Sequence, residues 1–194
     1  QVLRVLQAAS RFKIAKICPS HGLLWQDPKQ IQRILGCYTR WAGHQTDAGQ
    51  VLVVYDTMWH STEAMAKALA SAMEKEGLTV RMRDLQQTHI SDVMTDVLDC
   101  RLLLVGTPML NNRMLPTVAS FLMYLKGLKP KDRLAFAFGS YGWSKIGFKE
   151  VEQFLVEAGM ILAAEGRHIQ YVPDPGELQD LLTVVPELKA RLQG

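Results

Sequence analysis

Within residues 57–62, the side chains of Thr57, His60, Ser61 and Thr62 can donate hydrogen bonds to an anion. The segment comes just before an amphipathic helix pattern. Free backbone N–H groups and the positive end of the helix dipole favour an anion at such a helix N-terminus. Hydroxyl groups add donors without adding charge, so the segment predicts a site for a phosphate monoester. An ordinary helix cap would use the same residue types, and this alternative stays open for the segment taken alone.

Two further segments have compositions that suit a flat aromatic ring. Residues 106–116 follow an apolar run and contain neighbouring asparagines, whose amides both donate and accept hydrogen bonds. Residues 139–144 place a tyrosine and a tryptophan between glycines and serines, which favours ring stacking and close approach of the backbone. Taken singly, each segment could also be an ordinary turn or a flexible loop.

Together the three segments predict one ligand with a flat ring and one phosphate, which is FMN. The candidate cofactor-binding residues are Thr57, Met58, Trp59, His60, Ser61, Thr62, Thr107, Pro108, Met109, Leu110, Asn111, Asn112, Ser140, Tyr141, Gly142, Trp143 and Ser144. No catalytic acid, base or nucleophile is required, because a flavin carries the redox chemistry itself. The first apolar run is not followed by a P-loop or a G-x-G-x-x-G motif, which argues against an NTPase and a dinucleotide-binding fold.

The elements that must position these segments alternate along the chain. Apolar runs predict strands at 51–55, 79–83, 102–105, 134–138 and 160–164, and a helix pattern follows each of them. The last helix is expected at 178–185, broken or kinked by Pro186. Strict alternation predicts a parallel sheet with helices on both faces. We therefore expect an α/β, flavodoxin-like doubly wound sheet of strand order 2-1-3-4-5, with its ligand crevice at the carboxyl ends of the first and third strands.

Residues 1–46 differ from the rest of the chain in charge. They contain seven basic residues and one acidic residue, whereas residues 47–194 contain 15 basic and 18 acidic residues. In the first part we expect a helix at 2–11, a short strand at 14–18 and a helix from Asp27-Pro28 to Ala42. A polar, glycine-flanked linker is expected at 43–49.

Several classes of protein are excluded by composition. The mild acidity of residues 47–194 argues against a nucleic-acid partner. The apolar runs are far shorter than the ~20 residues of a membrane-spanning helix. The three cysteines form no C-x-x-C pattern and predict free thiols in a reducing compartment, hence a cytoplasmic protein.

At these same residues the chain resembles the flavodiiron proteins (A-type flavoproteins). The matching motifs are YDTMWHST at 55–62, GTPMLNN at 106–112, GSYGWS at 139–144, CPSHG at 18–22, and the helix that carries Tyr38 and Trp41 before the linker. The resemblance covers essentially the whole chain. It implies that residues 1–46 are the C-terminal remnant of a metallo-β-lactamase-like domain with its linker helix. Residues 47–194 would then be the flavodoxin-like FMN-binding domain.

The resemblance also implies a function for a longer parent protein. FMN would take electrons from a rubredoxin-like donor or a reductase, and a di-iron centre in a head-to-tail homodimer would reduce O₂ and/or NO. His21 matches an iron-ligating histidine of that family, but the H-x-E-x-D-H stretch that supplies further ligands is absent. Di-iron is therefore expected only in the intact parent. A C-terminal C-x-x-C rubredoxin module and an added flavin reductase domain are also missing.

Other functions fit the sequence less well. A free-standing flavodoxin or an FMN-dependent quinone reductase is the main alternative, and the CPSHG segment argues against it. A receiver domain would need an acceptor aspartate where Gly106-Thr107 stand, and a cofactor-free interaction domain would not need hydroxyls at 57, 61 and 62. Because the chain starts at Gln1, we expect a C-terminal fragment of a longer oxidoreductase, and whether the fragment alone is an enzyme stays open.

Overall fold

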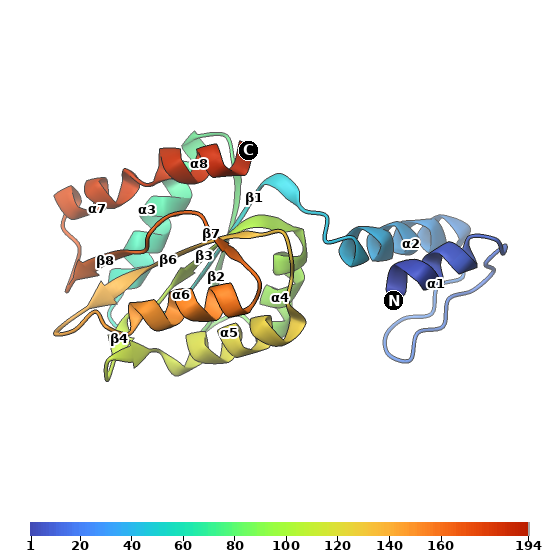
Figure 1. The fold of residues 1–194 in the computed structure, drawn as a ribbon, viewed down its shortest axis with the longest axis horizontal. Coiled ribbons are helices and arrows are strands. Elements are labelled where there is room, and N and C mark those ends of the chain that lie inside the picture. Colours follow the sequence, from blue (N-terminus) through green and yellow to red (C-terminus); the bar gives the residue numbers. More distant parts are fainter. Residues whose placement is uncertain (194) are drawn as a thin grey trace. The chain divides into compact units, whose positions relative to one another are not determined.

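The computed structural model describes residues 1–193, and the chain divides into two compact units at residues 1–45 and 46–194 (Figure 1). In the first unit, α1 (Val2–Ala9) packs on α2 (Pro28–Ala42). The predicted start of α2 is confirmed, because the Gln30 N–H donates to Asp27 Oδ1 over 2.9 Å and Pro28 opens the helix. The helix at 2–11 ends two residues early.

The strand predicted at 14–18 is wrong. Only Ile17 pairs, through two backbone hydrogen bonds of 3.0 Å with Trp25. An extended segment forms a strand only where a neighbouring strand accepts its backbone hydrogen bonds along its length. Among residues 1–45 no second extended segment runs beside 14–18 beyond that single bridge.

The second unit contains the predicted alternation of strands and helices. Its elements are β1 (Asp47–Tyr55), α3 (Ser61–Lys75), β2 (Thr79–Asp84), α4 (Ile90–Asp99), β3 (Cys100–Gly106), β4 (Met109–Leu110), β5 (Arg113–Met114), α5 (Pro116–Leu128), β6 (Leu134–Tyr141), α6 (Phe148–Glu157), β7 (Ile161–Leu162), β8 (Arg167–Gln170), α7 (Pro175–Leu182) and α8 (Val185–Gln193). The parallel sheet has the order β2-β1-β3-β6-β7, with β8 also paired to β6. The predicted doubly wound order is therefore confirmed.

The fifth strand position is split into two pieces. Leu134 pairs with Ile161 in β7, and Phe138 pairs with Arg167 in β8. Four steps along β6 thus correspond to six along the partner, so two extra residues are accommodated between β7 and β8. The Gly166 N–H in this interruption donates to Glu152 Oε1 over 2.9 Å, which satisfies a backbone donor that the sheet no longer pairs. The single strand predicted at 160–164 is corrected accordingly.

The C-terminal region forms two helices. The expected helix at 178–185 is divided between α7 and α8, and the chain turns at Thr183 and Val184. Pro186 lies in the first turn of α8, where a missing N–H is tolerated, rather than at the break itself. The start of α7 carries a capping box in which the Glu177 N–H donates to Asp174 Oδ1 over 2.8 Å.

Two apolar layers hold helices to the two faces of the sheet. Val51 and Val53 belong to the layer that packs against α3, α7 and α8. Leu52 and Val54 belong to the opposite layer, which contains residues of α4, α5 and α6 (Figure 1). Because the part of β1 at Val51–Tyr55 is covered on both faces, its sequence is continuously apolar instead of alternating. No helix within residues 1–193 is both long and apolar enough to cross a membrane.

Candidate functional site

A cavity of about 650 Å³ opens where the carboxyl ends of β1, β3, β6 and β8 meet the following loops. Its lining residues are Thr57, Met58, Trp59, Ser61, Pro108, Met109, Leu110, Asn111, Asn112, Ser140, Tyr141, Gly142, Trp143, Ser144, Tyr171 and Val172. The three predicted segments therefore meet in one crevice, as the doubly wound topology requires. In the part of the chain that the structure describes, no acidic, basic or histidine side chain lines this cavity.

The hydrogen-bond donors predicted in the segment before α3 differ in burial and in whether they line the cavity. Thr57 is only 8% exposed, and its hydroxyl has no hydrogen-bond partner within residues 1–193. An unpaired buried hydroxyl is costly unless a ligand or water completes it. Thr57 lines the cavity in the loop just before α3, and the free N–H groups and dipole at the N-terminus of that helix attract anions. Thr57 and Ser61 are thus placed to bind an oxyanion.

His60 does not line the cavity. It occupies a left-handed conformation with φ of 64°, and its exposed imidazole lies with Nδ1 2.7 Å from Glu63 Oε2. Lys67 forms a second contact with the Glu63 carboxylate, and the hydrogen bonds from Lys67 and then His60 lower the pKa of Glu63. The imidazole of His60 is therefore paired with the Glu63 side chain on the surface of α3.

Two other predicted ligands are engaged within the protein. The hydroxyls of Thr62 and Ser140 are hydrogen-bonded at 3.0 Å, and Thr62 is fully buried. Thr107 is also fully buried, and its Oγ1 donates to the Pro108 carbonyl over 2.9 Å and accepts from the Leu115 N–H over 3.1 Å. Thr62 and Thr107 therefore shape the loops of the cavity without lining it.

The wall after β3 is a short hairpin, and its turn carries the two asparagines of the predicted ring-binding segment. β4 and β5 pair antiparallel, and Asn111 and Asn112 between them have φ values of 51° and 61°. Two successive positive φ angles are typical of a type I′ turn, in which asparagine is favoured. Gly147 lies so close to this hairpin that a Cβ there would be 2.6 Å from the Asn112 carbonyl oxygen. The hairpin and the loop before α6 are thus packed together.

The remaining wall contains aromatic residues from two loops. Trp143 follows β6 and is 96% exposed, whereas Tyr171 and Val172 follow β8. The Tyr171 N–H donates to the Tyr141 carbonyl over 2.7 Å, which joins the two loops. Tyr171 and Val172 were not among the predicted site residues, because β8 itself was not predicted. The sequence signal available was an apolar pair directly before Pro173-Asp174-Pro175 at the end of a strand.

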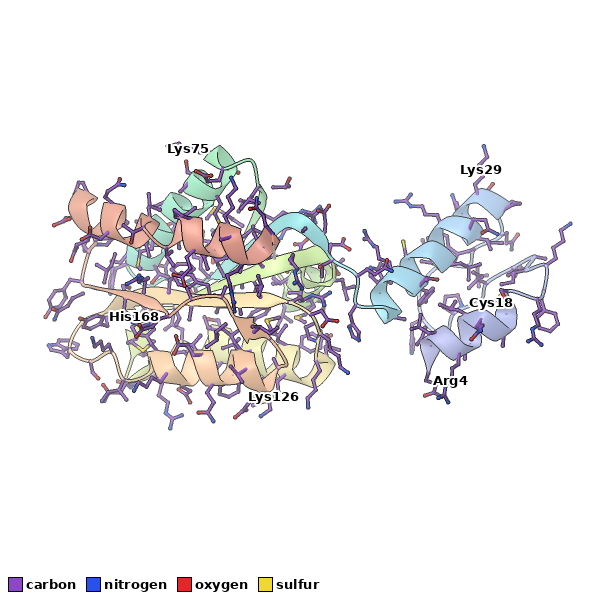
Figure 2. All side chains as sticks on the ribbon, turned by 45° about the horizontal axis from the view of Figure 1, so that its top comes forward. Arg4, Cys18, Lys29, Lys75, Lys126 and His168 are labelled. Atoms are coloured by element: carbon purple, nitrogen blue, oxygen red, sulfur yellow. The ribbon has the colours of Figure 1, made fainter. Side chains whose placement is uncertain are left out.

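A cluster of three packed rings, which includes Tyr141 of this wall, lies next to the cavity. Tyr141 packs edge-to-face on Phe148, and Phe148 stacks on His168 of β8 with 3.7 Å between ring centroids. Figure 2 labels His168 in the second unit. His168 Nε2 is buried without a hydrogen-bond partner in the described residues. Burial, followed by the positive charge of Lys145, lowers the pKa of His168 to about 4. The imidazole is therefore neutral near pH 7 and serves as a packing group.

Residues that could ligate a metal are not clustered within residues 1–193. Within residues 1–193, no cluster of three or more histidine, cysteine, aspartate or glutamate residues could hold a metal ion. His21 is exposed in the first unit, and Cys18, Cys37 and Cys100 are free thiols. The residues present do not fit a di-iron centre, so such a centre requires protein outside this chain.

Comparison with known proteins gives concordant results. The family model described as flavodoxin matches residues 53–183. A nitric oxide reductase of Moorella thermoacetica is 40% identical over 180 residues, which cover 92% of this chain and 44% of that protein. The solved rubredoxin oxygen:oxidoreductase of Desulfovibrio gigas has a TM-score of 0.90 and 32% identity, covering 99% of this chain and 48% of its own. The flavodiiron protein of Giardia intestinalis also has a TM-score of 0.90, with 26% identity over 99% of this chain and 47% of its own.

Proposed function

Because this chain belongs to the flavodoxin family, we propose that residues 47–194 bind FMN and transfer electrons within a larger flavodiiron oxidoreductase. The chain spans less than half the length of the relatives described above. The reaction proposed for the whole protein is the reduction of O₂ and/or NO, as the names of those relatives indicate. This chain contributes the cofactor-binding part of that reaction.

The observation that carries the proposal is the Thr57 hydroxyl. This hydroxyl is buried without a partner in the described chain, and Thr57 itself lines the cavity in the loop that leads into the 15-residue helix α3. The phosphate of FMN supplies acceptor oxygens for this hydroxyl, for Ser61 and for the free N–H groups of the first helical turn. The cavity volume is also in the range of ordinary small-molecule sites, ~300–1,000 Å³.

The other walls suit the ring of the same ligand. The asparagine turn at Asn111-Asn112 presents amides and backbone groups that hydrogen-bond polar ring edges. Tyr141, Trp143 and Tyr171 present aromatic faces on which a flat ring stacks. When bound, FMN supplies one- and two-electron redox chemistry. The protein's own residues bind it, orient it and cover part of its surface.

The remaining parts of the proposal concern the parent protein. We place the electron donor among rubredoxin-like proteins or reductases, which the name of the Desulfovibrio gigas relative supports. We interpret residues 1–46 as the end of a metallo-β-lactamase-like domain, with His21 as one ligand of a di-iron centre completed elsewhere. A head-to-tail homodimer would bring that centre near the flavin. The three free thiols support a reducing compartment such as the cytoplasm.

A free-standing flavodoxin or quinone reductase is less well supported. The match to the Moorella thermoacetica protein covers 92% of this chain and therefore includes much of residues 1–45, which lie outside the residues matched by the flavodoxin model. A free-standing flavodoxin has no need of that first unit. The compact helical unit formed by α1 and α2 thus favours a larger parent.

The proposal is tested by reconstituting the 194-residue chain with FMN and with riboflavin, which has the same ring without the phosphate. We expect FMN to bind, with a shifted flavin absorbance spectrum, and to bind more tightly than riboflavin. Thr57→Val should weaken FMN binding about tenfold, because a hydrogen bond to a charged group is lost. Thr95→Val, on an exposed threonine of α4, is the control and should leave FMN binding unchanged. A chain that binds no FMN would refute the proposal.

A further inference from the structure

Asp56 lies directly before Thr57 and is 2% exposed. Its carboxylate accepts hydrogen bonds from three segments that are far apart in the sequence. Oδ1 accepts from the Thr57 N–H over 2.6 Å and from Nε2 of Gln86, and Oδ2 accepts from Oγ1 of Thr117 at the start of α5. An ionised carboxylate only accepts hydrogen bonds, and this set of donors matches that requirement.

Gln86 connects this carboxylate to the backbone of the same segment. It follows β2, its side chain is exposed, and its Nε2 donates both to Asp56 Oδ1 and, over 2.7 Å, to the carbonyl oxygen of Thr57. A carbonyl can only accept, so the NH₂ end of the Gln86 amide must face it. The Gln86 backbone is itself fixed by a 2.8 Å hydrogen bond from its N–H to Asp84 Oδ1.

Both backbone polar groups of Thr57 are therefore hydrogen-bonded to other parts of the protein. Its N–H is held by Asp56 and its carbonyl by Gln86, whereas its hydroxyl has no partner in the described residues. This pattern fixes the backbone of Thr57, and it leaves the hydroxyl of this cavity-lining residue without a partner in the described residues. A donor fixed before binding loses little conformational entropy when the ligand arrives.

We propose that Asp56 and Gln86 are positioning residues that hold Thr57 with its hydroxyl directed at the phosphate subsite. The inference rests on the proposed FMN function and adds two residues that do not line the cavity. Because they act through Thr57, they affect recognition of the phosphate and not of the ring. Loss of either residue should therefore weaken FMN binding much more than riboflavin binding.

Four variants of the full chain test this inference by flavin fluorescence titration. Gln86→Ala should weaken FMN binding about three- to tenfold, because two hydrogen bonds that fix Thr57 are lost, and leave riboflavin affinity unchanged. Gln87→Ala is the matched control. Gln87 is also exposed and follows Gln86 directly, but within residues 1–193 its Nε2 donates to Asp84 Oδ2, over 3.1 Å, and not to Asp56 or Thr57. This control should bind both flavins as the unmodified chain does.

Two variants of Asp56 separate hydrogen bonding from simple loss of structure. Asp56→Asn keeps one oxygen for Thr57 and Gln86, and its new NH₂ group can donate to the Thr117 hydroxyl. It should therefore retain FMN affinity within about threefold. Asp56→Ala removes all three acceptor contacts and should weaken FMN binding at least tenfold. Gln86→Ala provides the same test on an exposed side chain if Asp56→Ala does not fold.

The possible results distinguish failure of the positioning role from failure of the proposed function. FMN affinity in Gln86→Ala equal to that in Gln87→Ala would overturn the positioning role while leaving the proposed function intact. Equal losses of FMN and riboflavin binding would also overturn it, since the effect would then not be confined to the phosphate. Failure of the unmodified chain to bind FMN would overturn the proposed function and the positioning role together.

Discussion

The hydroxyl groups of Thr62 and Ser140 lie 3.0 Å apart and join the first turn of α3 to the end of β6. Both side chains are buried, at 0% and 5% exposure. The hydrogen bond therefore fixes the start of α3 relative to the end of β6, and both segments contribute residues to the cavity lining. Thr62 was predicted from the sequence as a cofactor ligand, whereas the structure uses its hydroxyl to hold the helix start in place.

Thr62→Val should lower the free energy of unfolding by about 1 kcal/mol, because a buried hydrogen bond is lost in a side chain of similar shape. FMN affinity should change less than threefold, since Thr62 does not line the cavity. Urea unfolding and flavin titration measure the two effects. A loss of FMN affinity as large as that expected for Thr57→Val would instead identify Thr62 as a direct ligand.

Gly139→Ala should destabilise the second unit by at least 2–3 kcal/mol. A Cβ at this position would lie 1.9 Å from the Thr107 carbonyl oxygen and 2.6 Å from the Phe148 ring. Gly127→Ala in α5 is the control, because a Cβ there meets no atom within 4 Å. That substitution should be neutral or stabilising by up to ~1 kcal/mol. Thermal unfolding of both variants compares them, and similar melting temperatures would contradict the expected contact.

His168 should make stability depend on pH. Burial lowers its pKa to about 4 in the folded chain, so the unfolded chain binds more protons between about pH 4 and ~6.5. The stabilisation contributed by neutral His168 is complete above pH ~6.5, and it is lost as the pH falls toward 4. His168→Phe keeps a ring against Phe148 without titrating. The unmodified chain should lose stability as the pH falls from 7 to 4.5. Over this range the free energy of unfolding of the variant should therefore rise by about 2 kcal/mol relative to that of the unmodified chain.

Urea unfolding of both chains at the two pH values measures this gain. Carboxylates elsewhere titrate in both proteins and cancel in the comparison. A constant difference in the free energy of unfolding between pH 7 and pH 4.5 would show that His168 titrates as an ordinary exposed histidine.

Binding of FMN should stabilise the second unit by mass action. A ligand present at 100 times its Kd raises the free energy of unfolding by about 2.7 kcal/mol. This corresponds to an increase of roughly 5–10 °C in the melting temperature of a unit of this size. Because charged side chains are absent from the cavity lining in the described chain, the shift should change little between low and moderate salt. Differential scanning fluorimetry at two salt concentrations checks both points. A shift that disappears in moderate salt would indicate binding through surface charges instead.

The fold was predictable to the extent that buried strands carry a strong signal. Val51–Tyr55 and Leu102–Val105 are apolar throughout because helices cover both faces of the sheet there. β8 gave no such signal, because it lies at the sheet edge and only Ile169 among its residues is buried. The short strand expected at 14–18 shows the opposite error, since an apolar run cannot reveal whether a partner strand exists.

The candidate site shows the same division. The topology places the carboxyl ends of β1, β3 and β6 together, so the grouping of the three loops followed from the order of elements. The roles of single hydroxyls did not follow, because Thr57 and Thr62 look alike in sequence. One hydroxyl is left without a partner on the cavity wall, and the other is hydrogen-bonded to Ser140. Tertiary contacts alone distinguish them.

The interruption between β7 and β8 has a consequence for how this domain can diverge. β7 and β8 each pair with a different part of β6, at Leu134 and at Phe138, so neither half depends on the spacing to the other. We expect insertions between Ala164 and the exposed Glu165 to be tolerated without moving Tyr171 or Val172 at the cavity. The number of residues across this point is therefore free to drift among descendants of one ancestral gene, while the wall of the cavity stays in place.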